Sequence, residues 1–122
     1  ENDDRSYPFE DCFHIFEETG IPIVFDYYHH SVLNRREEFD GVMEKFTSTW
    51  KSEDGLPLLD YSSMKIGGCP GNHALSLDEV DFKKFIGETS SYDFDIMLEI
   101  KDKEESAIRA ADLLKNDKRF VG

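Results

Sequence analysis

Short apolar runs alternate with longer amphipathic segments along the whole chain. Three runs, 21–25 (IPIVF), 56–61 (LPLLDY) and 94–100 (FDIMLEI), are rich in β-branched and large apolar residues. Continuous apolar runs of this length are typical of strands that are covered on both faces, as in parallel sheets. Strands that alternate with helices at this spacing indicate βαβ units. The sequence therefore predicts an α/β fold with a parallel sheet.

Four helices are predicted, over residues 9–19, 34–50, 76–87 and 103–115. The second is indicated by apolar residues at helical spacing, namely Phe39, Val42, Met43, Phe46 and Trp50. A capping box is expected to begin the third helix, because Ser76 is followed three residues later by Glu79. The glycine- and proline-rich stretch 64–72 is predicted to be a loop.

The pattern supplies three strands, whereas a closed (β/α)₈ barrel has eight. Residues before Glu1 would supply a fourth strand, and the chain begins with Glu-Asn-Asp-Asp without an initiating methionine. We therefore expect residues 1–122 to form a single unit, about half of a TIM barrel that is incomplete without its other half. No apolar run approaches the roughly 18 residues of a membrane span.

The chain is strongly acidic, with 27 Asp and Glu against 14 Lys and Arg, a formal charge of −13. This balance argues against nucleic-acid binding, because phosphate contacts need Lys and Arg. Clustered carboxylates that bind metal ions can produce the same acidity. The two scattered cysteines, Cys12 and Cys69, have no zinc-finger spacing and suit a reducing compartment, so a cytoplasmic location is expected.

Metal-ligand residue types mark the ends of the predicted strands. In a barrel, the carboxyl ends of the strands and the loops that follow form the active-site face. Mixed Asp, Glu and His ligands suit Mn²⁺, Fe²⁺ or Zn²⁺ better than Ca²⁺. The candidate ligands are Glu1, Asp26, His29, Asp60, His73 and Glu99.

Other interpretations of these residues remain open. Asp26 would also serve as the cap of a following helix, and Glu99 would also form an ion pair with Lys101. His29 and His30 are adjacent and point in different directions, and the Asp-x-x-His spacing favours His29 as the ligand and His30 as a substrate-facing or supporting residue. Asp60 lies within an apolar strand and is hard to explain without a cation.

Four strings, ENDDRSY at 1–7, IPIVFDYYHH at 21–30, LDYSS at 59–63 and DIMLEIKDKE at 95–104, resemble those of the UV damage endonuclease family. The first and last, in this order, are the most specific. The resemblance runs from Glu1 to about Leu114 and covers the C-terminal half of the family's barrel. It implies a barrel related to those of endonuclease IV and xylose isomerase. It also implies an enzyme that nicks DNA on the 5′ side of UV photoproducts with divalent metal ions, often manganese.

Carried over residue by residue, the resemblance implies metal ligands at Glu1, Asp26, His29, Asp60, His73 and Glu99. Relatives place His or Asp at the position of Asp60, and some carry a modifiable Lys where this chain has Leu58. We expect Glu1, Asp26, His29, Glu99 and Lys101 to be catalytic, and Tyr27, His30, Ser62 and Ser63 to contact the substrate. Mn²⁺ is the expected cofactor, with Mg²⁺, Fe²⁺ or Zn²⁺ as alternatives.

Three functions compete. The first is a metal-dependent endonuclease that acts on UV-damaged double-stranded DNA, with much of the basic DNA-facing surface on the missing N-terminal half-barrel. The second is a sugar isomerase or epimerase on the same fold, since fold does not fix function. The third is a non-catalytic piece. The strings above favour the nuclease. The isolated chain is expected to bind metal weakly, to lack activity, and to pair into a homodimer.

Overall fold

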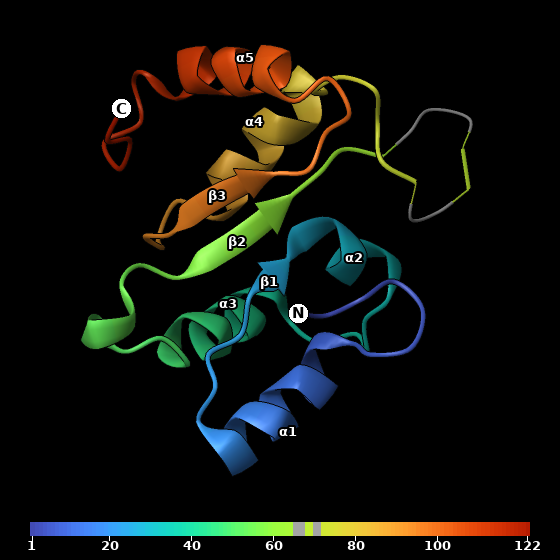
Figure 1. The fold of residues 1–122 in the computed structure, drawn as a ribbon, viewed down its shortest axis with the longest axis vertical. Coiled ribbons are helices and arrows are strands. Elements are labelled where there is room, and N and C mark those ends of the chain that lie inside the picture. Colours follow the sequence, from blue (N-terminus) through green and yellow to red (C-terminus); the bar gives the residue numbers. More distant parts are fainter. Residues whose placement is uncertain (65–67, 70–71) are drawn as a thin grey trace.

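The protein is described by a computed structural model, which covers residues 1–64, 68–69 and 72–122. Three parallel strands, β1 (Phe25–Asp26), β2 (Leu58–Tyr61) and β3 (Asp95–Leu98), form a sheet in the order β1-β2-β3. Figure 1 shows α4 (Glu79–Glu88) and α5 (Glu104–Leu114) beside β3, and α1 (Phe9–Thr19) and α3 (Phe39–Ser48) beside β1. The predicted alternation of helices with parallel strands is confirmed, and the chain is part of an α/β barrel.

Helix α1 begins and ends at the predicted residues. Glu10 and Asp11 lie in its first turn, where carboxylates favour the positive end of the helix dipole. Gly20 ends the helix in the left-handed conformation, with φ of 75°, and its N–H donates to the Phe16 carbonyl at 2.7 Å. The terminal glycine therefore sets the direction in which the chain enters β1.

The first strand is much shorter than the predicted run 21–25. Only Phe25 and Asp26 pair with β2. The backbone of Ile23 is bonded instead to side chains beyond α3, because its N–H donates to Thr49 Oγ1 at 3.1 Å and its carbonyl accepts from Trp50 Nε1 at 2.7 Å. These two side chains replace a strand partner, so the apolar run is buried without extending the sheet.

The predicted helix 34–50 is wrong in its first part. The chain forms a separate short helix, α2 (Tyr27–Val32), directly after β1, and α3 begins only at Phe39. Between them, Arg36 has a φ of 62°, and its N–H donates to the side chain of Asn34. Asp26 causes the early start, because its side chain accepts from the His29 N–H and caps α2.

The expected capping box at Ser76 and Glu79 is also wrong. The N-cap of α4 is Asp78, whose side chain accepts from the Asp81 N–H at 3.1 Å. The residue before this N-cap, Leu77, is bonded to α5 and not to α4. Its N–H donates to the buried hydroxyl of Ser106 at 2.9 Å. A 3₁₀ turn, Ser52–Asp54, precedes β2, and α5 falls where a helix was predicted. The loop predicted at 64–72 falls partly on residues 65–67 and 70–71, outside those described.

The register of the sheet separates two faces. Phe25, Leu59 and Ile96 are paired across the strands and pack toward the helices, where Phe25 and Leu59 are fully buried. Asp26, Asp60 and Met97 are paired on the opposite face. Met97 is 49% exposed there. The helix-facing side of the sheet therefore packs in the hydrophobic core. The opposite side, which would face the inside of a barrel, is open among the described residues.

Arg119 joins the C-terminal segment to the end of α4. Its guanidinium donates to the carbonyls of Ile86, Thr89 and Tyr92 at 2.6 to 3.2 Å and pairs with Asp117 at 2.6 Å. We expect Arg119→Ala to lower the free energy of unfolding by about 2 kcal/mol, because charge-assisted bonds to helix-end carbonyls are lost. Urea unfolding measures this. Lys118→Ala, an exposed neighbour, is the matched control and should be neutral; equal losses would contradict the assignment.

Candidate metal centre

Ligand-type atoms meet at the carboxyl ends of the three strands. Glu1, Asp26 and His29 form one group, and Asp26, Asp60 and Glu99 form a second. Within each group the ligand atoms lie within 4.8 Å of one another. Asp26 belongs to both groups. The structure thus brings together five of the six residues predicted as ligands, although their sequence positions span the whole chain.

Asp26 has two roles at the end of β1. Its Oδ1 accepts from the His29 N–H at 2.8 Å and caps α2. Its Oδ2 lies 3.1 Å from His29 Nδ1. The helix cap considered as an alternative to metal binding is therefore real, and it leaves the second carboxylate oxygen directed at the cluster. Because the cap fixes the first turn of α2, it also fixes where His29 stands.

Asp60 is the most deeply placed carboxylate of the centre. It is 3% exposed, and its Oδ1 has no hydrogen-bond partner among the described residues. Burial, a hydrogen bond with Glu1 and the negative charges of Glu1, Glu99 and Asp26 raise the pKa of Asp60 to about 8. A buried carboxylate beside other carboxylates is costly without a positive partner. The sequence had already indicated that an aspartate within an apolar strand, here Asp60, is hard to explain without a cation.

Asp26 is perturbed in the same direction. Burial is the main cause, opposed by the His29 N–H and ring, and with the charges of Glu1 and Glu99 it raises the pKa of Asp26 to about 6. The described part of the chain has no ion pair between Glu99 and Lys101, and Lys101 is exposed. Among the described residues no Lys or Arg pairs with these carboxylates, and their donor set fits a divalent metal ion such as Mn²⁺.

His73 lies beside this cluster but outside both groups. Its ring centroid is 6.1 Å from that of His29 and 6.1 Å from that of Tyr28. An isolated bridge between Met64 and His73 holds the start and the end of the intervening loop together. The histidine thus lies beside His29, and its role as a ligand stays a prediction.

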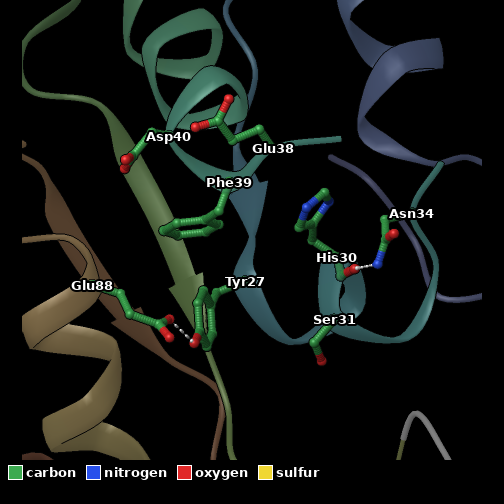
Figure 2. A pocket seen from close by; sticks show the side chains of 8 residues that line it. All are labelled: Tyr27, His30, Ser31, Asn34, Glu38, Phe39, Asp40 and Glu88. Carbon is green, nitrogen blue, oxygen red and sulfur yellow. Dashed lines mark hydrogen bonds between the residues drawn. The ribbon is translucent and has the colours of Figure 1, made fainter. Parts of the chain in front are cut away.

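Two residues predicted to contact substrate line a different cavity. Figure 2 shows Tyr27 and His30 with Phe39 and Glu88 around a cavity of about 500 Å³. The Tyr27 hydroxyl donates to Glu88 Oε2 at 2.8 Å, and burial together with this carboxylate raises the Tyr27 pKa. His30 is buried against Phe25, and burial lowers its pKa. Neither Tyr27 nor His30 belongs to the two ligand groups.

Ser62 and Ser63, also predicted to contact substrate, are buried at the end of β2. The Ser63 hydroxyl lies 3.0 Å from the Tyr61 hydroxyl, which donates to Asp81 at 2.5 Å, and it accepts from the Asp78 N–H at 3.3 Å. Ser62 Oγ is buried and has no partner among the described residues. Ser63 therefore joins β2 to the start of α4, and neither hydroxyl is presented to solvent.

Leu58 stands two residues before Asp60 on the same strand, so the two side chains share the open face of the sheet. Leucine supplies no ligand there.

Sequence reasoning missed one buried polar residue of the centre, Asn2. The side-chain carboxamide of Asn2 makes two hydrogen bonds with the backbone of Asp26. The main-chain carbonyl oxygen of Asn2 lies 3.1 Å from His29 Nδ1. The string ENDDRSY contains this residue, but no local pattern indicates a contact with a residue 24 positions away. An uncharged Asn beside a candidate ligand was the one available signal.

The chain is similar in sequence to a family of known proteins. The profile of the family described as UV-endonuclease UvdE matches residues 1–120. The chain is 32% identical over 117 residues to the UV DNA damage endonuclease of Clostridium perfringens, covering 94% of this chain and 28% of that protein. It is 30% identical over 129 residues to the UV DNA damage endonuclease of Bacillus velezensis, covering all of this chain and 40% of that protein.

A solved structure matches as well. The crystal structure of SacUVDE superposes with a TM-score of 0.88 at 42% identity, covering 98% of this chain and 39% of that one. The chain thus spans about a third of the length of the relatives it matches. None of the described helices is long and apolar enough to cross a membrane. From the profile match and these relatives, the chain belongs to the UV-endonuclease UvdE family.

Proposed function

We propose that this chain is the C-terminal half of a metal-dependent endonuclease barrel that incises DNA on the 5′ side of UV photoproducts. The observation that carries the proposal is the carboxylate cluster around Asp26 at the strand ends, in which a buried Asp60 oxygen lacks any partner in the described chain. The family match supports the nuclease over a sugar isomerase. The proposed enzyme works in the cytoplasm, where its two free thiols suit reducing conditions.

The residues of the cluster have distinct tasks in this proposal. Glu1, Asp26 and Glu99 hold divalent cations, and Asp60 completes the second group while His29 completes the first. When bound, such ions stabilise the charge of an in-line displacement at phosphorus and activate water for the attack. Without bound cations, the carboxylates would repel the negatively charged phosphodiester. Metal ions offset this charge, so the proposed reaction depends on metal.

DNA contact needs positive charge that the cluster does not supply. Lys101 and Lys103 are exposed on the segment that joins β3 to α5, next to Glu99, and they belong to no ion pair within the described residues. In this proposal these two lysines contact phosphates of the DNA backbone. Because the net charge of the chain is −13, the proposal places most of the basic surface on the other half of the barrel.

The proposal is tested with UV-irradiated plasmid and the protein in its longest natural form. Conversion of supercoiled to nicked plasmid should require irradiation and Mn²⁺ and should stop on addition of EDTA. End mapping on a photoproduct-containing oligonucleotide should place the nick on the 5′ side. The 122-residue chain alone should not nick DNA, because part of the metal centre is absent. Nicking of unirradiated DNA at the same rate would refute the damage specificity.

The chain prepared by itself is expected to self-associate. β3 forms one edge of the described sheet, and Met97 is exposed on its open face. Unpaired strand edges and uncovered apolar side chains favour pairing with a second copy, most simply with two-fold symmetry. Light scattering should show a dimer at high concentration, and Met97→Lys should weaken it. A monomer at every concentration would show that the half-barrel is self-sufficient.

A further inference from the structure

Asn2 is a fully buried polar side chain in the N-terminal segment, with 0% exposure. Its Nδ2 donates to the Asp26 carbonyl at 2.9 Å, and its Oδ1 accepts from the Asp26 N–H at 2.8 Å. The carboxamide therefore satisfies both backbone groups of Asp26, as a neighbouring strand residue would. This pair of bonds fixes the distance between Glu1, which precedes Asn2 in the chain, and Asp26.

The main chain of Asn2 contacts the second candidate ligand. Its carbonyl oxygen lies 3.1 Å from His29 Nδ1, and Asp26 Oδ2 lies 3.1 Å from the same nitrogen. Both neighbours are acceptors, so the hydrogen of the neutral ring is favoured on Nδ1. The lone pair is then on Nε2. The nitrogen that carries no hydrogen is the one that binds a metal ion.

We propose that Asn2 is a positioning residue of the metal centre, which ties Glu1 to Asp26 and holds His29 in the tautomer that offers Nε2 to the cation. The proposal rests on the function proposed above and adds how three ligands from separate segments are held in place. Asn2 touches Asp26 and His29 and is covalently joined to Glu1, so one residue contacts the whole first group.

The tautomer is tested on the unsubstituted chain. Nitrogen-15 labelled histidine, observed through long-range proton–nitrogen correlations in EDTA at pH 8, distinguishes Nδ1–H from Nε2–H rings. The His29 signal is identified by its loss in His29→Asn. We expect the Nδ1–H form to dominate at His29. A ring that carries its hydrogen on Nε2 would overturn the assignment, and this measurement needs no Asn2 variant to fold.

The positioning role is tested by Mn²⁺ affinity. Asn2→Ala should weaken Mn²⁺ binding by about 10- to 100-fold, the usual effect of removing a group that orients a ligand. Electron paramagnetic resonance of free Mn²⁺ measures this even for weak sites. Asn2→Ser, which keeps a small polar side chain but cannot reach Asp26, should behave in the same way.

Thr49→Ala is the matched control. Thr49 is also buried, and its hydroxyl bonds the backbone of Ile23 and Phe46, away from the ligands. Both Asn2→Ala and Thr49→Ala should lower the melting temperature, but only the former should weaken Mn²⁺ binding. Equal loss of affinity in both variants would show that Asn2 is merely structural. If the unsubstituted chain binds no Mn²⁺, the proposed metal centre fails, whereas the tautomer spectrum still decides the role of Asn2.

Discussion

Asp26→Asn should reduce Mn²⁺-dependent incision of UV-irradiated DNA by about 10³-fold in the protein that carries this chain with the rest of its barrel. Asp26 belongs to both ligand groups, so loss of its charge weakens two sites at once. Asparagine retains the size of the side chain and is itself a good helix cap, so α2 should remain formed. Initial rates of plasmid nicking at saturating Mn²⁺ measure the effect.

Asp78→Asn is the matched control for this substitution. Asp78 caps α4 through a bond to the Asp81 N–H, in the same manner as Asp26 caps α2, but it belongs to neither ligand group. It should leave incision within about twofold of the unsubstituted protein. An Asp26→Asn enzyme that retained more than a tenth of its activity would mean that Asp26 is a helix cap and little else.

In EDTA, Asp60→Asn should stabilise the chain by about 3 kcal/mol at pH 8.5, and by only roughly a quarter of that at pH 5. The native state raises the pKa of Asp60 from 3.8 to about 8. Between these values the native state holds a proton that the unfolded chain has released, so stability falls as the pH rises through this window. Asparagine has no charge to bury, so the variant should lose that part of the pH dependence. Urea unfolding at both pH values measures the difference.

Two comparisons sharpen this result. Asp95→Asn removes an exposed carboxylate from the neighbouring strand and should leave stability nearly unchanged at both pH values. Saturating Mn²⁺ should reverse the order, because the unsubstituted chain gains stability from the bound ion and the variant gains less. If Asp60→Asn were destabilising at pH 8.5 in EDTA, the buried oxygen would have a favourable partner that the cluster does not provide.

The positions of Asp26, Asp60 and Glu99 could be predicted because each lies within or directly after an apolar run, and parallel strands place such residues at one edge. Asp60 and Glu99 were found in this way. Helix α1 was predictable to the residue because Pro8 and Gly20 are local signals. These features depend on patterns that extend over a few neighbouring residues.

What the sequence did not predict depends on contacts between distant residues. Helix α2 was hidden because Asp26 has the residue type of both a cap and a ligand, and apolar spacing gave no helix there. The shortness of β1 arises from Thr49 and Trp50, which bond Ile23 from the far end of α3. The position of Asn2 depends on Asp26, a contact formed only in the folded chain.

The six-residue helix α2 is too short to persist without its surroundings, since isolated helices of fewer than about 12 residues are marginal in water. Its N-cap, Asp26, lies in the candidate metal centre, and its residue His30 lines the cavity of Figure 2. The short helix α2 therefore contributes residues to both the candidate metal centre and this cavity. Any occupant of the cavity that shifted α2 would change the affinity of the metal centre, and by reciprocity a bound cation would change the affinity of the cavity by the same factor.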